Sequence, residues 1–423
     1  MASHEPEAQP QPSTSTPIEP PTDDAPSAPP PVERTASPSP PAPRWYEALT
    51  IGAFADAYAQ VNWSFPSPQT QNTRGNDNMI GFALGWAGAN LAYDNGVVGG
   101  TIQLRFGPRV QRYNLTDASN VGLAMRYVKQ AYATWKPKLA KGRLAFDFGK
   151  WDSTFGADNG DSYLNMNYSW PFLYWYGQPF FHTGLRMSAQ LVERLGLTLF
   201  VANGWNNTQD NNGGKTFGAQ LVGTPRDEVT LVLGYMTGPE GEAHIDVVCA
   251  PDTAFDAGSG RCVAMAGAAG ETHHLGQRRV NRRFRHFVDL VLLADLHPKL
   301  RLAFNADVGL DQQITNPVTG GFRNVQWYGA TLALRYAFAQ KWAAAARADV
   351  IRDAEGFDTG VNKLVVGSGT LTFDYSPMPA LTIRLENRLD GANQAYFPRR
   401  PSDLRRYQVT SLVAVNIMMP KLF

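Results

Sequence analysis

Charged residues recur at alternate positions in several stretches of the chain. In "RLENRL" (384–389), Arg384, Glu386 and Arg388 alternate with Leu385 and Leu389. Alternate residues of an extended strand point to the same face, so these charges share one side and the leucines the other. A wet face that carries both signs can contact ions and polar solutes. The candidates for this chemistry are Arg105, Arg143, Asp147, Arg186, Arg301, Asp307, Arg347, Asp349, Arg384, Glu386 and Arg388.

An aromatic stretch is the second notable feature. Eight of the twenty residues in "NMNYSWPFLYWYGQPFFHTG" (165–184) are aromatic, and no Asp, Glu, Lys or Arg lies between Asp161 and Arg186. That uncharged length would suit a membrane-spanning helix. Pro171, Pro179 and Gly177 argue against such a helix, because proline and glycine disfavour helix interiors. The aromatic surface therefore needs another place to pack.

Two cysteines, with twelve residues between them, bound the stretch "CAPDTAFDAGSGRC". The Gly-rich spacer makes a disulfide between Cys249 and Cys262 easy to close, and we expect one in an oxidising compartment. The stretch "GADNGDS" (156–162) has acidic residues as in a calcium loop but lacks the closing glutamate, so no metal site is expected. No phosphate-binding loop, HExxH or GxSxG motif is present, and we expect neither a catalytic residue nor a cofactor.

Composition divides the chain of 423 residues into two regions. Residues 1–44 hold fourteen of the thirty prolines and almost no large apolar side chain, which predicts a disordered tether that could contact a periplasmic partner. Residues 45–423 have a uniform composition along their length. The balance of 38 basic and 37 acidic residues gives no reason to expect nucleic-acid binding. No secretory signal is recognisable at the start, so an exported form would have lost it or would begin upstream.

The elements that must position these residues are strands. Apolar and polar residues alternate over segments of about ten residues, which is the strand period. Short turns such as "DNG", "ERLG" and "AQK" alternate with long loops along the whole region. The sixteen predicted strands are 49–61, 79–93, 97–107, 125–136, 143–151, 181–193, 195–204, 215–223, 228–237, 284–296, 299–310, 325–339, 341–351, 362–375, 381–389 and 405–418.

Long loops on one rim and tight turns on the other are typical of a transmembrane antiparallel up-and-down β-barrel. Strands of about ten residues cross a bilayer at a tilt, and closure leaves no unpaired edge in lipid. An even number of strands puts both termini on the short-turn rim. Sixteen strands are enough to enclose a water-filled lumen.

Several motifs resemble the OmpL-like β-barrel porin family of Gram-negative outer membranes. The resemblance is carried by "IGAFADAYAQVNW" (51–63), "AYATWKP" (131–137), "DFGKWDSTFGADNGDSYLNMNYSWPF" (147–172) and "QPFFHTGLRMS" (178–188). The residues at matching positions are Trp151, Phe155, Gly156, Ser169, Pro171, His182, Thr183 and Gly184. This resemblance implies a passive diffusion porin. Phe423 ends the last strand as in such barrels, although Pro420 interrupts the alternation.

In such a barrel the aromatic stretch belongs to the third long loop, 152–180. By analogy with general porins, this loop folds inward as a constriction. Its candidates are Asp152, Asp158 and Asp161 at the narrowest point, and Tyr168, Trp170, Tyr174 and Trp175 packed against the wall. Two alternatives stay open. The rings form part of the outer aromatic girdle, or they form a platform on which sugars stack.

The leading hypothesis is a porin that passes small polar solutes by passive diffusion. The charged candidates would then line the pore, or merely neutralise one another in a wet lumen. The alternative is an anchor or export conduit of a larger envelope complex, without channel activity of its own. We expect contacts with outer-membrane lipid and lipopolysaccharide, the latter through the basic stretch 278–286, and a homotrimer by analogy. Both termini would be periplasmic.

Overall fold

The computed structural model describes most of the chain beyond the proline-rich region. The described residues are 44–67, 71, 74–114, 117, 123–240, 245–256, 261–275, 284–315, 322–401 and 403–419. Residues 1–43 of the predicted tether, most of the basic stretch 278–286 and Phe423 lie outside the described residues.

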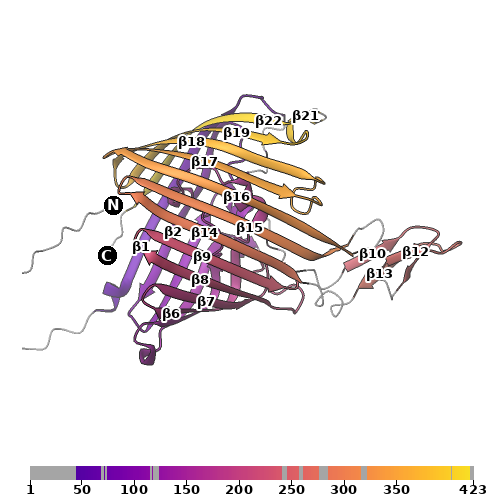
Figure 1. The fold of residues 1–423 in the computed structure, drawn as a ribbon, viewed down its shortest axis with the longest axis horizontal. Coiled ribbons are helices and arrows are strands. Elements are labelled where there is room, and N and C mark those ends of the chain that lie inside the picture. Colours follow the sequence, from indigo (N-terminus) through magenta and orange to yellow (C-terminus); the bar gives the residue numbers. More distant parts are fainter. Residues whose placement is uncertain are drawn as a thin grey trace, which may run out of the picture. The chain divides into compact units, whose positions relative to one another are not determined.

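Sixteen antiparallel strands form one closed barrel, as the sequence predicts. They are β1 (Leu49–Asn62), β2 (Ile80–Asp94), β3 (Val98–Phe106), β4 (Val128–Trp135), β5 (Leu144–Asp152), β6 (Phe181–Val192), β7 (Leu195–Ala202), β8 (Thr216–Arg226), β9 (Val229–Gly238), β14 (Arg285–His297), β15 (Leu300–Thr315), β16 (Phe322–Ala339), β17 (Trp342–Asp353), β18 (Leu364–Met378), β19 (Leu381–Ala392) and β22 (Tyr407–Met418). Each strand pairs with its neighbours in the chain, and Figure 1 shows their common tilt. The barrel closes where β1 pairs with β22, for example Phe54 with Met418.

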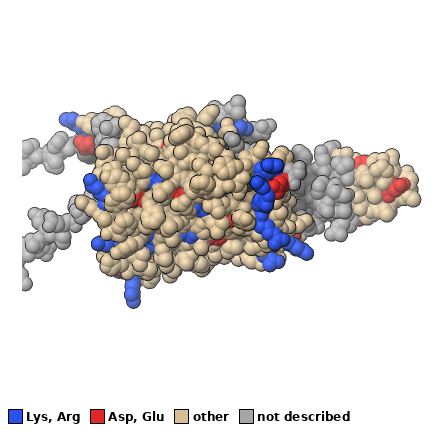
Figure 2. Space-filling view, turned by 90° about the horizontal axis from the view of Figure 1, so that it is seen from above, with Lys and Arg blue, Asp and Glu red and all other residues tan. Residues whose placement is uncertain are grey.

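The barrel is polar inside and apolar outside. On β19, Arg384 and Glu386 are 4% and 1% exposed, whereas Leu385 between them is 45% exposed. A water-soluble protein buries its apolar face instead, so this reversal fits a wall surrounded by lipid. Figure 2 shows one side of the molecule, on which uncharged residues dominate and Lys and Arg gather mainly toward the ends.

Short helices and small sheets lie in the connections between the barrel strands and in the residues before β1. The helices are α1 (Pro108–Asn114), α2 (Phe172–Gly177), and the 3₁₀ turns η1 (Trp45–Ala48), η2 (Leu123–Tyr127), η3 (Lys138–Ala140) and η4 (Ser162–Leu164). None of the helices among the described residues has the length and apolar character needed to cross a membrane. The small sheets pair β10 (Ile245–Cys249) with β13 (Glu271–Leu275), β11 (Thr253–Asp256) with β12 (Arg261–Ala264), and β20 (Phe397–Arg400) with β21 (Asp403–Arg405). A disulfide joins Cys249 to Cys262, with an S–S distance of 2.10 Å.

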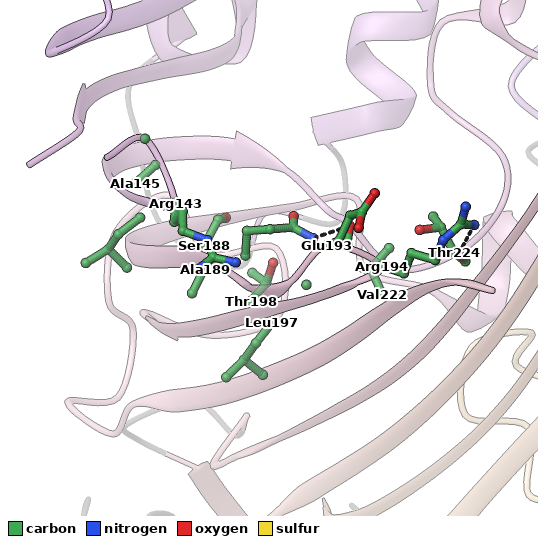
Figure 3. A pocket seen from close by; sticks show the side chains of 14 residues that line it. Arg143, Ala145, Ser188, Ala189, Glu193, Arg194, Leu197, Thr198, Val222 and Thr224 are labelled. Carbon is green, nitrogen blue, oxygen red and sulfur yellow. Dashed lines mark hydrogen bonds between the residues drawn. The ribbon is translucent and has the colours of Figure 1, made fainter. Parts of the chain in front are cut away.

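A groove of about 440 Å³ lies near the short-turn ends of β5 to β8. Its lining includes Ser188, Gln190 and Thr198, and Figure 3 shows Arg143 and Arg194 beside it. Arg194 donates a hydrogen bond of 3.1 Å to the carbonyl of Thr224 on the next hairpin. Polar and apolar side chains line this groove at the short-turn rim.

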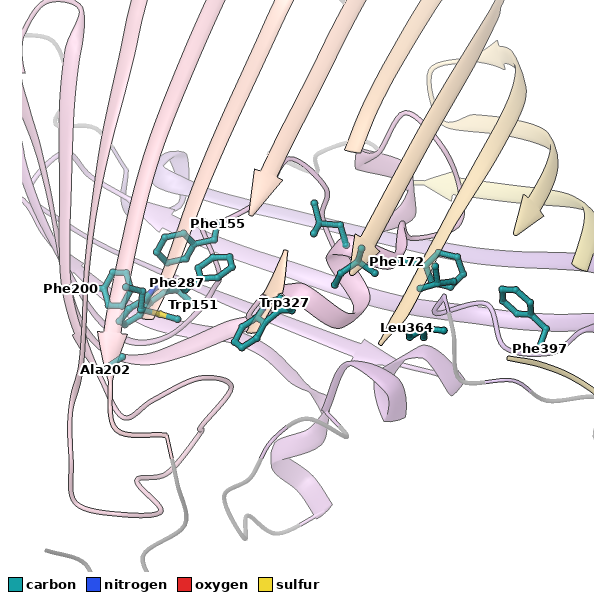
Figure 4. Close-up of a cluster of buried hydrophobic side chains, with 13 residues drawn as sticks. Trp151, Phe155, Phe172, Phe200, Ala202, Phe287, Trp327, Leu364 and Phe397 are labelled. Carbon is teal, nitrogen blue, oxygen red and sulfur yellow. The ribbon is translucent and has the colours of Figure 1, made fainter. Parts of the chain in front are cut away.

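The apolar core is built of strand and loop side chains that pack together inside the barrel. Figure 4 shows Trp151, Phe155, Phe200 and Phe287 in one group, with Trp327 and Phe172 further along the same cluster. A second cluster packs Trp86 and Tyr113 with Trp170, Tyr174 and Phe180. Both clusters include residues of the loop between β5 and β6, so the core depends on that loop.

Candidate functional site

The loop between β5 and β6 lies inside the barrel and reaches its opposite wall. We call residues 153–180 the inner segment. It leaves from β5, the fifth strand, and makes hydrogen bonds to β17, the thirteenth of sixteen. Strands in those positions are as far apart around the ring as two strands can be. The inner segment therefore spans the lumen.

Arginines of the far wall donate to backbone carbonyls of the inner segment. Arg384 donates to the carbonyls of Ser162 (2.7 Å) and Asn165 (2.9 Å). Arg347 donates to the carbonyl of Ser169 (2.6 Å). Arg388 donates to the Ser169 hydroxyl (3.0 Å) and to the carbonyl of Trp170 (2.6 Å). These bonds fix the path of the inner segment by its backbone carbonyls rather than by its side chains alone.

Carboxylates of the same wall accept from the backbone of the inner segment. Glu386 accepts the N–H groups of Tyr168 (2.7 Å) and Ser169 (3.1 Å). Asp349 accepts the N–H of Phe172, the first residue of α2, at 2.9 Å. Hydrogen bonds to charged acceptors are stronger than neutral ones, so these contacts hold the chain in one path.

The near wall holds the inner segment through Asp161. Arg105 on β3 makes two hydrogen bonds to its carboxylate, of 3.0 and 2.8 Å, and Lys129 on β4 adds one of 3.0 Å. Burial alone would raise the pKa of Asp161, but Lys129 and Arg105 hold this pKa below its usual range. Asp161 is therefore the charged anchor on this side.

The aromatic rings of the inner segment are buried inside the barrel. Of the four predicted rings, Tyr168 and Trp170 are fully buried, Tyr174 is 4% exposed, and Trp175 is partly exposed. Trp170 stacks on Trp175 and lies close to Tyr174. This placement contradicts the girdle alternative. It also leaves three of the four rings without the open face that a stacking sugar needs.

Two other loops reach the same region with residues that the sequence analysis missed. Arg74, from the loop after β1, pairs with Asp390 and donates to Thr410 at 2.7 Å. Arg109 of α1 pairs with Asp56 of β1 at 2.9 Å. Burial lowers the pKa of Arg74 to about 10, so it remains charged at neutral pH. No sequence pattern distinguishes a loop that folds inward from one that projects outward.

The remaining predicted residues lie in different places. Asp307 accepts a hydrogen bond from Gln178 of the inner segment, and Asp152 accepts one from Tyr113. Arg186 pairs with Asp147 at 2.7 Å, away from the inner segment.

Arg301 and Arg143 lie at the short-turn rim. Arg301 is half-exposed and pairs with Asp295, and Arg143 is exposed in the turn before β5 rather than within a strand. Asp158 of the inner segment is partly exposed. The predicted pore-lining set is therefore divided between residues that hold the inner segment and residues nearer the short-turn rim.

The arrangement offers a polar lumen narrowed by a fixed segment, with charges of both signs on its wall. In the described part of the chain, no group of three or more His, Cys, Asp or Glu residues is placed to hold a metal ion. A closed barrel of sixteen strands with an apolar exterior and a charged interior has the architecture of an outer-membrane porin.

The chain belongs to the family described as "Putative beta-barrel porin-2, OmpL-like", whose model matches residues 48–419. It is therefore a porin-type channel protein of the bacterial outer membrane. No curated protein matches the sequence.

Solved porin structures share the fold at low sequence identity. An anion-selective porin from Comamonas acidovorans has a TM-score of 0.53 at 8% identity, covering 88% of this chain and 99% of its own. The outer membrane channel DcaP of Acinetobacter baumannii has a TM-score of 0.52 at 10% identity, covering 88% of this chain and 97% of its own. OprB of Pseudomonas putida has a TM-score of 0.51 at 12% identity, covering 88% of this chain and 94% of its own. These likenesses support the fold, not the solute.

Proposed function

We propose that the protein passes small polar solutes by passive diffusion, with the inner segment as the constriction of the lumen. The observation that carries the proposal is the set of hydrogen bonds from Arg347, Arg384, Glu386 and Arg388 to the inner segment. They fix an obstacle across the lumen, and a fixed obstacle limits solute size. The paired charges of both signs predict weak preference between anions and cations.

The proposed orientation follows from the strand count. In this class of barrel the short turns face the periplasm and the long loops face outward. Both ends of the barrel domain lie on the short-turn rim, so we place them in the periplasm with residues 1–44 as a tether. Contacts with lipopolysaccharide and assembly into a trimer belong to the same proposal.

One observation favours the alternative of an anchor or conduit that opens only with a partner. Arg74, Arg105, Arg109 and Arg388 are each 2% exposed or less. Side chains so thoroughly covered do not line a water path in this state. A closed form would therefore need a partner, or movement of the inner segment, to conduct.

Single-channel conductance of the purified, refolded protein in a planar bilayer tests the proposal. We expect open channels whose conductance rises in the variant R384A/R388A, which lacks four hydrogen bonds to the inner segment. A second variant, with residues 157–177 replaced by a short Gly/Ser linker, should conduct more still.

The matched control is R399A/R405A. It also removes two arginines, but both belong to the β20–β21 hairpin, where they pair with Asp403 and are 41% and 45% exposed. We expect its conductance to stay near that of the wild type. Silence of all folded forms would contradict the porin proposal and favour the partner-dependent conduit.

A further inference from the structure

Two arginines face each other on neighbouring strands near the short-turn rim. Arg301 of β15 and Arg335 of β16 are Cα partners in the antiparallel register, so their side chains share one face of the sheet. That face is the inner one, because Arg335 alternates with the outward-facing Leu334 and Tyr336. Like charges directly opposite each other in a sheet repel. An anion between the two guanidinium groups would relieve this repulsion.

Carboxylates neutralise the two arginines only in part. Arg301 donates one hydrogen bond to Asp295 (2.7 Å), and Arg335 donates one to Asp374 (2.8 Å). Arg384 of β19 also lies beside Asp374, at 3.2 Å, so two arginines share that carboxylate. Three guanidinium groups therefore have two carboxylates between them.

Most N–H donors of Arg301 and Arg335 remain available to a solute. A guanidinium carries five N–H donors. Each of these two arginines uses one on its aspartate and makes no other hydrogen bond to the part of the chain that the structure describes. Arg186 of β6 differs, because two of its N–H groups bind Asp147, at 3.0 and 2.7 Å, and it is only 14% exposed. The wall at β15 and β16 thus offers donors that the wall at β6 does not.

The three arginines form a row that leads from the short-turn rim to the inner segment. Side-chain exposure falls from 50% at Arg301 through 28% at Arg335 to 5% at Arg384. Arg384 ends the row, since its guanidinium binds the carbonyls of Ser162 and Asn165. Because barrel strands are tilted, a row that runs across them also climbs along the barrel axis. A solute that enters at the short-turn rim would meet the guanidinium groups in this order.

Alanines of β17 make room for Arg335 to lie along the wall. Asp374 belongs to β18, so Arg335 of β16 reaches it across β17. The β17 residues that pair with Arg335 and Asp374 are Ala345 and Ala343, and both are buried. A larger side chain at either position would stand in the path of the arginine. The small residues therefore hold the guanidinium beside the lumen instead of across it.

We propose that Arg301 and Arg335, with Arg384 behind them, bind small solutes that carry a carboxylate or phosphate group. Planar guanidinium groups bind both of these oxyanions through paired hydrogen bonds. The inference rests on the proposed function and deepens it, because it names a class of solute. The lumen as a whole balances its charges, whereas the arginine row is a local site for oxyanions.

The test is calorimetric titration of sodium succinate, and separately of sodium phosphate, into refolded full-length protein in detergent, in an amine buffer at low salt. We expect the wild type to bind at least one of the two anions, and R301A and R335A to bind it at least ~5-fold more weakly. R335K should retain part of the affinity, because lysine keeps the charge but not the planar fork. D295N should bind more tightly than the wild type, since it frees Arg301 from its carboxylate.

The matched controls are R194A and D227N in another short turn. Arg194 is 48% exposed and pairs with Asp227 at 3.0 Å, much as Arg301 is 50% exposed and pairs with Asp295 at 2.7 Å. We expect both control variants to bind the anion as the wild type does.

Three results would overturn the proposal. The first is a wild type that binds neither succinate nor phosphate. The second is unchanged binding in R301A and R335A, and the third is an equal loss in R194A, which would assign binding to rim charge in general. D295N keeps the test decisive where an arginine variant fails to fold. A barrel that binds succinate but stays silent in a planar bilayer would contradict the proposed function and still support the oxyanion site.

Discussion

Asp161 is held as an ion by basic side chains from two different strands. Its carboxylate lies 2.8 Å from Arg105 and 3.0 Å from Lys129. Since these partners lower its pKa in the folded state, the stabilisation is complete above the unfolded value near 3.9 and is lost as pH falls through the lower folded value.

Part of the acid sensitivity of the fold can therefore be assigned to Asp161. We expect the free energy of unfolding to fall below about pH 4, and D161N to show a smaller fall over the same range. At neutral pH, D161N should cost roughly 3–5 kcal/mol, because two buried cations lose a partner. Urea unfolding at pH 7, 4 and 3 measures both effects. Equal acid sensitivity of wild type and D161N would contradict the assignment.

The direction of side chains was predictable from the sequence, but their partners were not. The alternation around Arg384, Glu386 and Arg388 correctly placed these residues on the inner face, because strand geometry fixes side-chain direction. That each of them binds the backbone of the inner segment depends on a loop path without periodicity. For the same reason the contributions of Arg74 and Arg109 could not be foreseen.

At the scale of elements, β15 and β16 extend beyond the predicted ends. β15 continues to Thr315 and β16 begins at Phe322, where the sequence predicts a long loop over 311–324. These added residues extend beyond the length needed to cross the bilayer. The two strands remain paired there, with Ile314 opposite Arg323. The short helix α2 was not predicted either, since it is held by packing against β16 and β17 rather than by helix propensity.

A glycine of β15 makes room for the packing of α2. A Cβ on Gly309 would lie 2.0 Å from Cε2 of Trp327, whose indole N–H donates to the carbonyl of Gly177 at 3.0 Å. We expect G309A to displace this ring and to lower the free energy of unfolding by about 1–3 kcal/mol. Urea unfolding and tryptophan fluorescence measure the change.

The control for that substitution is G369A. A Cβ on Gly369 of β18 would meet no atom within 4 Å, so the same added methyl group has space. Comparable losses in G309A and G369A would show that the loss of glycine itself, and not contact with Trp327, is responsible.

For the whole molecule, the apolar outer wall implies a cost for charge that depends on depth. Leu233 is 53% exposed near the middle of β9, and Val229 begins the same strand on the same face. We expect L233R to cost about 2–4 kcal/mol and V229R about 0–1 kcal/mol in lipid vesicles. Urea unfolding of the vesicle-bound barrel compares them. Equal costs would mean that Leu233 does not face the bilayer core.

The pairing of β1 with β22 also has a consequence for biogenesis. The side chain of Asn62 donates to Gln408, a residue 346 positions later, and this contact is part of the seam that closes the wall. Contacts so distant in sequence form slowly, and no shorter N-terminal fragment can make them. A chain truncated before β22 would present two unpaired edges to lipid. The seam can therefore close only after the whole barrel sequence, β22 included, has been synthesised and exported.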